Sequence, residues 1–312
     1  MILTRREFHG AALGGLMAAP FARLGLARQS AFGATAAAAQ KPDSRVAGVR
    51  IGAQSYSFRD YGTRNVDSVI EALTACGLAY CELWSTHVEV RENLKGMEAL
   101  APREARRKWR LEVPLTYFTD IRKKFETAGI TLTAYNLSFV SDWTDAEIAR
   151  GFEMARALGT DVITASSPVS ISPRVDAIAQ KAKITVGFHN HGDISPDQFA
   201  RPDDFAEARK GRSDRIKINL DIGHFTAAGF DPLAYLDEHH ANIVSLHIKD
   251  RTKAGGNTPF GQGETPIAAV LQRLRDRKWD IPAQIEYEYK GTDAITEVKR
   301  SFEFCRQALL AT

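Results

Sequence analysis

The chain has 312 residues, of which 44% are hydrophobic and 25% are charged, and these proportions exclude a largely disordered protein. Its three cysteines are too few for a scaffold held together by many disulfides, and its formal net charge is only +3. The length is compatible with one barrel of alternating strands and helices, which commonly runs to about 250 residues.

Residues 1–39 have the features of an export signal. The twin arginine Arg5-Arg6 precedes an uncharged run, Gly10–Phe21, and a small-residue tract, Ala34–Ala39, follows. This order is typical of a Tat-type signal, so we expect cleavage after Ala39 and a periplasmic protein. The uncharged run is shorter than the roughly 20 residues of a membrane span, so we expect no stable membrane anchor after cleavage. An amphipathic anchor or a disordered tail is the alternative interpretation.

Most of the positive charge belongs to this signal. Residues 1–39 contain four arginines and one glutamate, which leaves the mature chain close to neutral. A near-neutral chain argues against a basic binding face, so we expect no nucleic-acid partner. Cys76 is expected to end a helix and Cys81 to open a buried strand, so both are predicted to be packed thiols.

A strand–helix pattern begins after a linker at residues 40–47 and fills residues 48–312. The expected strands are apolar runs without strict alternation, as in strands buried on both faces of a parallel sheet. We expect strands at 49–58, 79–84, 130–137, 161–166, 184–190, 216–221, 242–249 and 281–288. We expect helices at 66–75, 103–110, 117–127, 144–158, 173–182, 202–210, 231–240, 266–277 and 292–309, the charged one at 103–110 being solvated. A doubly wound open sheet also alternates in this way, but eight units ending in a helix favour a closed (β/α)8 TIM barrel.

Two neighbouring strands carry the clearest functional signal at their C-terminal ends. Asp221 ends the strand at 216–221, with His224 in the following turn, and His247 lies near the end of the strand at 242–249. In a parallel barrel the C-terminal strand ends meet at one mouth, where active sites lie. Carboxylate and imidazole side chains there predict a metal site. A lone His247 would be more typical of a barrel core, but the neighbouring Asp221 favours a metal ligand.

Further ionisable or aromatic side chains fall at the same edge, namely Glu82, Trp84, His189, His191, Lys249 and Glu286. A carboxylate such as Glu286 on a buried strand is costly unless it is paired or bound to metal, and Glu288 is the alternative carboxylate on the same face. The simpler interpretations are an arginine partner for Glu82 and an ion pair between Lys249 and Asp250. A set of carboxylates and imidazoles suits Mn²⁺, Mg²⁺, Zn²⁺ or Co²⁺, and spacing does not choose among them.

Four ordered motifs and a late glutamate carry a resemblance to a known family. They are Gly187-Phe188-His189-Asn190-His191, Asp221-Ile222-Gly223-His224, Leu246-His247-Ile248-Lys249-Asp250, Gly261-Gln262-Gly263-Glu264 and Glu286. Over residues 48–310 the chain resembles the sugar phosphate isomerase/epimerase group of xylose isomerase-like barrels. The resemblance implies one divalent metal held by Glu, Asp, His and Glu from strands five to eight. Asp221, His247 and Glu286 match the last three ligands, and His189 stands where the family has its first glutamate.

The resemblance also implies a reaction, namely isomerisation or epimerisation of a sugar or keto-sugar by removal of a proton next to a carbonyl. We expect Glu286 and one of His189 and His191 to move the proton, while the choice of the metal-binding histidine stays open. We expect the carbohydrate to contact Glu82, Trp84, His224 and Lys249. Periplasmic location favours an unphosphorylated sugar or a glycoside. The sequence leaves open the sugar, the metal and whether the protein forms a homo-oligomer.

Three other functions compete with this interpretation. A lyase or hydrolase of 3-keto-glycosides would use the same proton removal, and sequence does not distinguish it. A non-catalytic sugar-binding barrel is the second alternative, because His189 replaces a glutamate. A metal-dependent apurinic endonuclease is the third, but it needs a three-metal cluster and a basic face for DNA, which a near-neutral chain argues against.

Overall fold

The computed structural model describes residues 41–311 except 90, 95–96, 101 and 255. The expected export signal at residues 1–39 lies outside the described residues. Within the described part of the chain, no helix combines the length and the apolar character needed to cross a bilayer.

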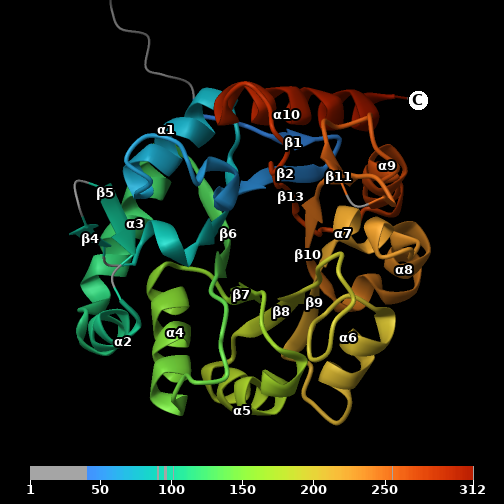
Figure 1. Cartoon of the computed structure of the whole chain (residues 1–312). Helices are drawn as coiled ribbons and strands as arrows, with labels where there is room; N and C mark the ends of the chain where they lie inside the picture. The colour runs from blue at the N-terminus through green and yellow to red at the C-terminus, as the bar shows by residue number, and fades with distance from the viewer. Residues whose placement is uncertain (1–40, 90, 95–96, 101, 255, 312) are drawn as a thin grey trace, which may run out of the picture. The chain divides into compact units, whose positions relative to one another are not determined.

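Eight parallel strands form a closed barrel, which confirms the predicted (β/α)8 architecture (Figure 1). They are β2 (Val49–Gln54), β3 (Tyr80–Trp84), β6 (Thr131–Asn136), β7 (Val162–Ala165), β8 (Thr185–His189), β9 (Ile216–Asp221), β10 (Ile243–Ile248) and β13 (Ala283–Ile285). The sheet closes because β2 pairs with β13 on one side and with β3 on the other. All C-terminal strand ends therefore face one mouth.

Helices surround the barrel in Figure 1, and most of them bury one face. They are α1 (Val66–Cys76), α2 (Arg103–Glu112), α3 (Leu115–Ala128), α4 (Asp145–Ala157), α5 (Ser172–Ala182), α6 (Pro202–Arg209), α7 (Ile222–Ala227), α8 (Pro232–His239), α9 (Ile267–Arg277) and α10 (Ala294–Leu310). Their boundaries follow local rules. Thr144 and Glu147 form a capping box at the start of α4, and Gly77 ends α1 with a φ of 72°.

Fully buried aliphatic side chains on the outer face of the strands, which include Ile51, Ile163, Val186, Ile218, Leu246 and Ile285, form part of the core between the barrel and its helices. Cys76 and Cys81 are buried free thiols, as predicted. Burial raises the pKa of the Cys76 thiol to about 12, so it stays protonated. Against this apolar background the ionisable groups at the strand ends stand out, because each needs a partner to be stable there.

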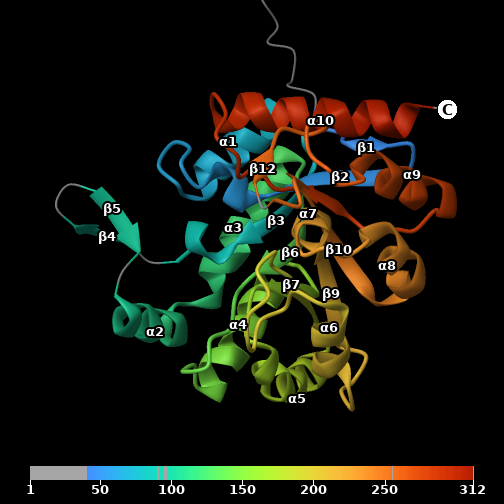
Figure 2. The same cartoon turned by 45° about the vertical axis from the view of Figure 1, so that its right-hand side comes forward.

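Several short elements differ from the prediction. The first strand ends at Gln54, whose side chain accepts a hydrogen bond from the Tyr56 backbone and turns residues 55–58 into a short 3-10 helix. The last strand is shorter than predicted and ends at Ile285. In the segment expected to be a linker, β1 (Arg45–Val46) pairs antiparallel with β2. Two further antiparallel pairs lie outside the barrel sheet: β4 (Arg91–Leu94) with β5 (Met97–Leu100), visible in Figure 2, and β11 (Asp250–Arg251) with β12 (Asn257–Thr258).

The expectation that the charged helix is solvated holds for most of α2 but is wrong at Arg110. Arg110 is only 5% exposed, and its Nε donates to Glu89 at 2.7 Å. Arg103 and Arg107 donate to the fully buried Glu147 of α4, both at 2.9 Å. The charged run therefore packs α2 against α4 through a buried network of ion pairs.

Candidate active site

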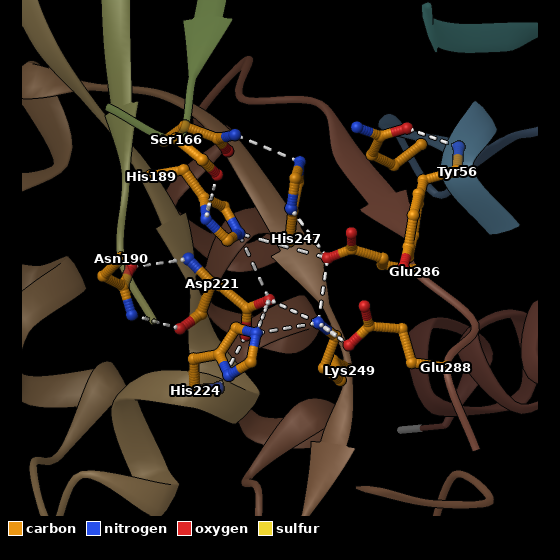
Figure 3. A network of polar contacts seen from close by, with 12 residues as sticks. Tyr56, Ser166, His189, Asn190, Asp221, His224, His247, Lys249, Glu286 and Glu288 are labelled. Carbon is orange, nitrogen blue, oxygen red and sulfur yellow. Dashed lines mark hydrogen bonds and ion pairs between the residues drawn. The ribbon is translucent and has the colours of Figure 1, made fainter. Parts of the chain in front are cut away.

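Four consecutive strands of the barrel deliver four buried ionisable side chains to one point at the mouth. His189 ends β8, Asp221 ends β9, His247 lies in β10, and Glu286 directly follows β13. The register places Asp221 directly opposite His247 on the neighbouring strand. Each of these residues is less than 9% exposed. Figure 3 shows their side chains converging.

These four residues each offer one ligand atom, and the four atoms lie within 4.8 Å of one another. Nε2 of His189 is 3.5 Å from Oδ2 of Asp221 and 4.0 Å from Oε2 of Glu286, and Nδ1 of His247 is 3.0 Å from that same Glu286 oxygen. All four of these atoms are buried, and none makes a well-formed hydrogen bond, although Lys249 lies within ion-pair distance of the two carboxylate oxygens. Buried polar atoms without a well-formed hydrogen bond are rare, so four that converge suit a cation that all four share. Two imidazole nitrogens and two carboxylate oxygens are ligands for a divalent cation, so this group could hold a metal ion.

In His189 and Asp221, the second ring nitrogen or carboxylate oxygen makes a hydrogen bond away from the common point. Nδ1 of His189 lies 3.2 Å from the Ser166 hydroxyl, and Oδ1 of Asp221 accepts from the His224 backbone at 2.7 Å. Asn190 exchanges two hydrogen bonds with the Asp221 backbone, at 3.0 and 3.1 Å. These contacts orient the remaining nitrogen or oxygen toward the common point, as in many metal sites.

Glu82 contacts His247 on the side of the imidazole ring that faces away from the other three residues. It is fully buried, and its Oε1 lies 2.8 Å from Nε2 of His247, which leaves Nδ1 to face the other three side chains. Asn136 and Ser245 also donate to the Glu82 carboxylate, at 3.1 and 3.4 Å. Burial lowers the pKa of His247, but Glu82 and Glu286 outweigh burial and raise it above its ordinary value. Glu82 does not line the pocket, so the structure places it behind His247 rather than against a substrate.

Lys249 brings a buried positive charge to the same group. Its Nζ lies 3.0 Å from Oε2 of Glu286 and 3.2 Å from Oδ2 of Asp221, and it donates to Glu288 at 2.6 Å (Figure 3). Burial lowers the pKa of Lys249, but the Asp221, Glu286 and Glu288 carboxylates outweigh burial and raise it. Lys249 thus forms ion pairs with three carboxylates and partly neutralises them.

His224 and His191 complete the imidazole cluster. Nε2 of His224 is 3.0 Å from the Lys249 ammonium, and its Nδ1 contacts Arg251. Burial is the main cause of the lowered pKa of His224. Burial and the nearby His189 lower the pKa of His191 to about 4, so this imidazole is neutral near pH 7.

These groups open into a pocket of about 240 Å³. It is lined by Gln54, Tyr56, Trp84, Asn136, Ser138, Ser166, His189, His191, His224, His247, Lys249, Glu286 and Glu288. The rings of Tyr56 and Trp84 meet edge to face with centroids 4.9 Å apart, which gives the pocket an apolar side. Phe58 and Phe139, two other aromatic residues near strand ends, are instead buried in the core.

The structure brings together nearly all the residues selected from the sequence. Of these, Trp84, His189, His191, His224, His247, Lys249 and Glu286 line one pocket, with Asp221 fully buried beside them. Sequence reasoning missed Gln54, Asn136, Ser138 and Ser166. Each lies at or just after a strand end, but amides and hydroxyls are common in such loops, so position alone did not single them out.

A family model described as a xylose isomerase-like TIM barrel matches residues 70–308. Among solved structures, a sugar phosphate isomerase/epimerase from Parabacteroides distasonis is 17% identical, with a TM-score of 0.61 and 84% of this chain and 97% of that chain covered. The 3-keto-D-glucoside 4-epimerase of E. coli is 12% identical, with a TM-score of 0.60 and 83% and 99% covered. The IOLI protein with a bound zinc atom is 14% identical, with a TM-score of 0.62 and 85% and 100% covered. These identities show a shared fold alone, and no curated protein matches the chain.

Proposed function

Because the chain belongs to the xylose isomerase-like TIM barrel family, we propose that it is a divalent-metal-dependent isomerase or epimerase of a sugar or keto-sugar. The reaction would remove a proton next to a carbonyl. The observation that carries this proposal is the convergence at the barrel mouth of four buried ligand atoms that lack well-formed hydrogen bonds. Two structural neighbours named as epimerases or isomerases support the reaction class.

His189, Asp221, His247 and Glu286 would hold the metal. When bound, a divalent ion supplies positive charge that stabilises negative charge developing on a carbonyl oxygen. Of Mn²⁺, Mg²⁺, Zn²⁺ and Co²⁺, the two imidazole ligands favour zinc or cobalt over magnesium. The neighbour solved with zinc supports this choice. In this assignment His189 is the metal ligand and His191 is left for proton transfer.

Glu286 and His191 are our proposed proton-transfer groups. Both line the pocket, and the His191 imidazole is neutral near pH 7, so one of its ring nitrogens carries a lone pair. Glu286 is held as a carboxylate, because Lys249 and His247 lower its pKa against the opposing effect of burial. A sugar C–H between the two groups could lose its proton to one of them. Return of that proton to the neighbouring carbon is isomerisation, whereas delivery to the opposite face of the same carbon of a proton that the other group has taken up from solvent is epimerisation.

The remaining pocket residues bind the sugar. Trp84 and Tyr56 present an apolar surface suited to a face of a sugar ring, and Lys249 and His224 offer polar contacts to its oxygens. Glu82 acts through His247 and is proposed as a positioning residue. Export through a Tat-type signal, proposed from residues 1–39 alone, would supply the periplasm with an enzyme already folded around its metal.

The proposal is tested by proton exchange. Incubation of natively purified protein with keto-sugars in D₂O should replace the proton next to the carbonyl with deuterium, which NMR detects. A Glu286→Gln variant should lose at least about 100-fold in exchange rate, and Glu303→Gln on the exposed side of α10 is the matched control. Absence of exchange with every keto-sugar, in protein shown to carry metal, would overturn the reaction class.

A further inference from the structure

The residues that line the pocket divide into two halves of the barrel mouth. Those on or after β8, β9, β10 and β13 are all histidine, lysine or glutamate. Those on or after β2, β3, β6 and β7 are uncharged near pH 7, namely Gln54, Tyr56, Trp84, Asn136, Ser138 and Ser166. Because β2, β3, β6 and β7 are neighbours in the closed sheet, the candidate metal centre faces a continuous neutral half of the mouth.

Asn136, the last residue of β6, has its side-chain amide fixed in one orientation. Its Nδ2 donates to Oε1 of Glu82 and to Oγ1 of Thr164, both at 3.1 Å, which uses both of its protons. The reversed amide would set Oδ1 of Asn136 against the Glu82 carboxylate, and neither oxygen could donate. Since Glu82 and Thr164 are fully buried, Oδ1 is the amide atom left for the pocket, where it accepts from no described residue.

Gln54, the last residue of β2, is fixed in the opposite sense. Its Oε1 accepts from the backbone N–H of Tyr56 at 2.6 Å, in the contact that begins the short 3-10 helix. The reversed amide would place two donors against each other, so Nε2 is the atom left for the pocket. The neutral half of the mouth therefore presents one fixed acceptor, on Asn136, and one fixed donor, on Gln54.

Glu82 connects Asn136 to the candidate metal centre. The same Oε1 that accepts from Asn136 lies 2.8 Å from Nε2 of His247, on the opposite side of the barrel. One buried carboxylate therefore orients both a candidate metal ligand and the amide that faces it across the mouth. Because the two contacts share one oxygen, the Asn136 amide cannot turn over to suit a different ligand without disturbing the contact to His247.

An acceptor that is fixed in this way distinguishes between groups on a sugar. A free hydroxyl can donate to Oδ1 of Asn136, whereas a carbonyl oxygen, a ring oxygen or a C–H group cannot. A group that does not donate leaves a buried acceptor unpaired, which typically weakens binding about tenfold or more. A carbonyl is thus disfavoured beside Asn136, while it can accept from Nε2 of Gln54 or lie at the candidate metal centre.

We propose that Asn136 determines the orientation of the substrate, because its Oδ1 accepts a hydrogen bond from a free hydroxyl of the sugar. Gln54 donates to another oxygen of the same sugar, and the carbonyl group is directed toward the candidate metal centre. Both amides bind and orient the sugar, and neither moves a proton. This inference rests on the proposed function for the carbonyl-bearing sugar and adds the hydroxyl that the site requires.

The test is calorimetric titration of the Zn²⁺-loaded full chain with 3-ketoglucose and its 2-deoxy, 4-deoxy and 6-deoxy derivatives. At least one derivative should bind the wild type about tenfold more weakly than 3-ketoglucose does. In Asn136→Leu, which keeps the size of the side chain but cannot accept, that derivative should bind within about twofold of 3-ketoglucose. Asn136→Ala, which cannot overfill the site, should lose the selectivity in the same way, and Gln307→Leu at an exposed position of α10 should keep it.

Binding of all four sugars to the wild type within about twofold of one another would overturn the role of Asn136. So would an unchanged selectivity in both Asn136 variants, because a purely structural role weakens all four sugars by the same factor. Absence of binding by every sugar would overturn it as well.

Calorimetry needs no turnover, so these results are separate from the D₂O experiment. Selectivity that depends on Asn136 without proton exchange would contradict the reaction class and leave the role of Asn136 standing. Proton exchange with an unchanged selectivity in the variants would do the reverse.

Discussion

Replacement of Glu82 by glutamine tests whether the buried carboxylate behind His247 tunes the metal site. Glu82 accepts from Nε2 of His247 at 2.8 Å, so it fixes which ring nitrogen faces the cluster and raises the basicity of that nitrogen. Glutamine has the same size, and it removes the negative charge. Loss of such a supporting carboxylate typically weakens metal binding about 10–100-fold, which corresponds to about 1.4–2.7 kcal/mol.

The assay is calorimetric titration of metal-free protein with Zn²⁺ and Mn²⁺. The Glu82→Gln variant should bind both ions with a dissociation constant about 10–100-fold higher than the wild type. Its rate of proton exchange should fall in proportion when the metal concentration is too low to saturate the site. Glu71→Gln, on the exposed face of α1, should bind both ions like the wild type. An affinity of Glu82→Gln within twofold of the wild type would refute the role of Glu82 as a positioning residue.

Two further predictions concern charge and stability. Lys249→Met removes the buried ammonium and leaves three neighbouring carboxylates uncompensated, so metal-free protein should lose about 3–5 kcal/mol in free energy of unfolding. Denaturant titration should show that loss, and saturating Zn²⁺ should recover much of it. An unchanged free energy of unfolding would contradict the electrostatic account. For Glu147, burial raises the pKa, but hydrogen bonds from Arg103, the Thr144 backbone and Arg107 outweigh burial and lower it to about 2. Because the pKa is lower in the folded than in the unfolded protein, the ionised carboxylate stabilises the fold at pH values above about 4.3, the ordinary glutamate pKa. This stabilisation is lost as the pH falls toward 2. The stability difference between wild type and Glu147→Gln, on the order of 2–3 kcal/mol, should therefore stay constant above pH 5 and narrow from pH 5 to pH 2, and a pH-independent difference would contradict the assignment.

The barrel was predictable because its signal is repeated eight times. Each apolar strand and each amphipathic helix is a weak indication, but the order of the units leaves few architectures. The small elements lacked such support. The two-residue strand β1 and the short helix α7 carry no periodicity, and β4–β5 falls in a charged stretch with no turn signal that we recognised.

The sequence predicted which ionisable residues lie at the C-terminal ends of the strands. Parallel strands that close into a barrel must bring their C-terminal ends together, so Asp221, His247 and Glu286 could be placed near one another without coordinates. The sequence could not separate Glu82 from the pocket-lining residues. A difference of one residue in where a strand ends decides whether a side chain lines the pocket or lies deeper in the barrel. The hydrophobic pattern of the sequence did not show that Glu82 pairs with Gln54 inside the sheet.

His189 shows the same limit in another form. Sequence analysis left His189 and His191 as equal candidates for the metal, because they are separated by one residue after the same strand. In the structure Ser166 contacts Nδ1 of His189, so that Nε2 faces Asp221, whereas His191 also lines a neighbouring hollow of about 300 Å³. The distinction depends on a hydroxyl from the neighbouring strand end, which no local pattern around residue 189 records.

The central claim is that His189, Asp221, His247 and Glu286 share one cation. Elemental analysis of natively purified protein, without refolding or added chelator, tests it most directly when wild type and His247→Ala are compared. We predict close to one divalent ion per chain in the wild type and loss of most of it in His247→Ala. A wild-type protein that is purified without metal and takes up none of Mn²⁺, Mg²⁺, Zn²⁺ and Co²⁺ would contradict the account.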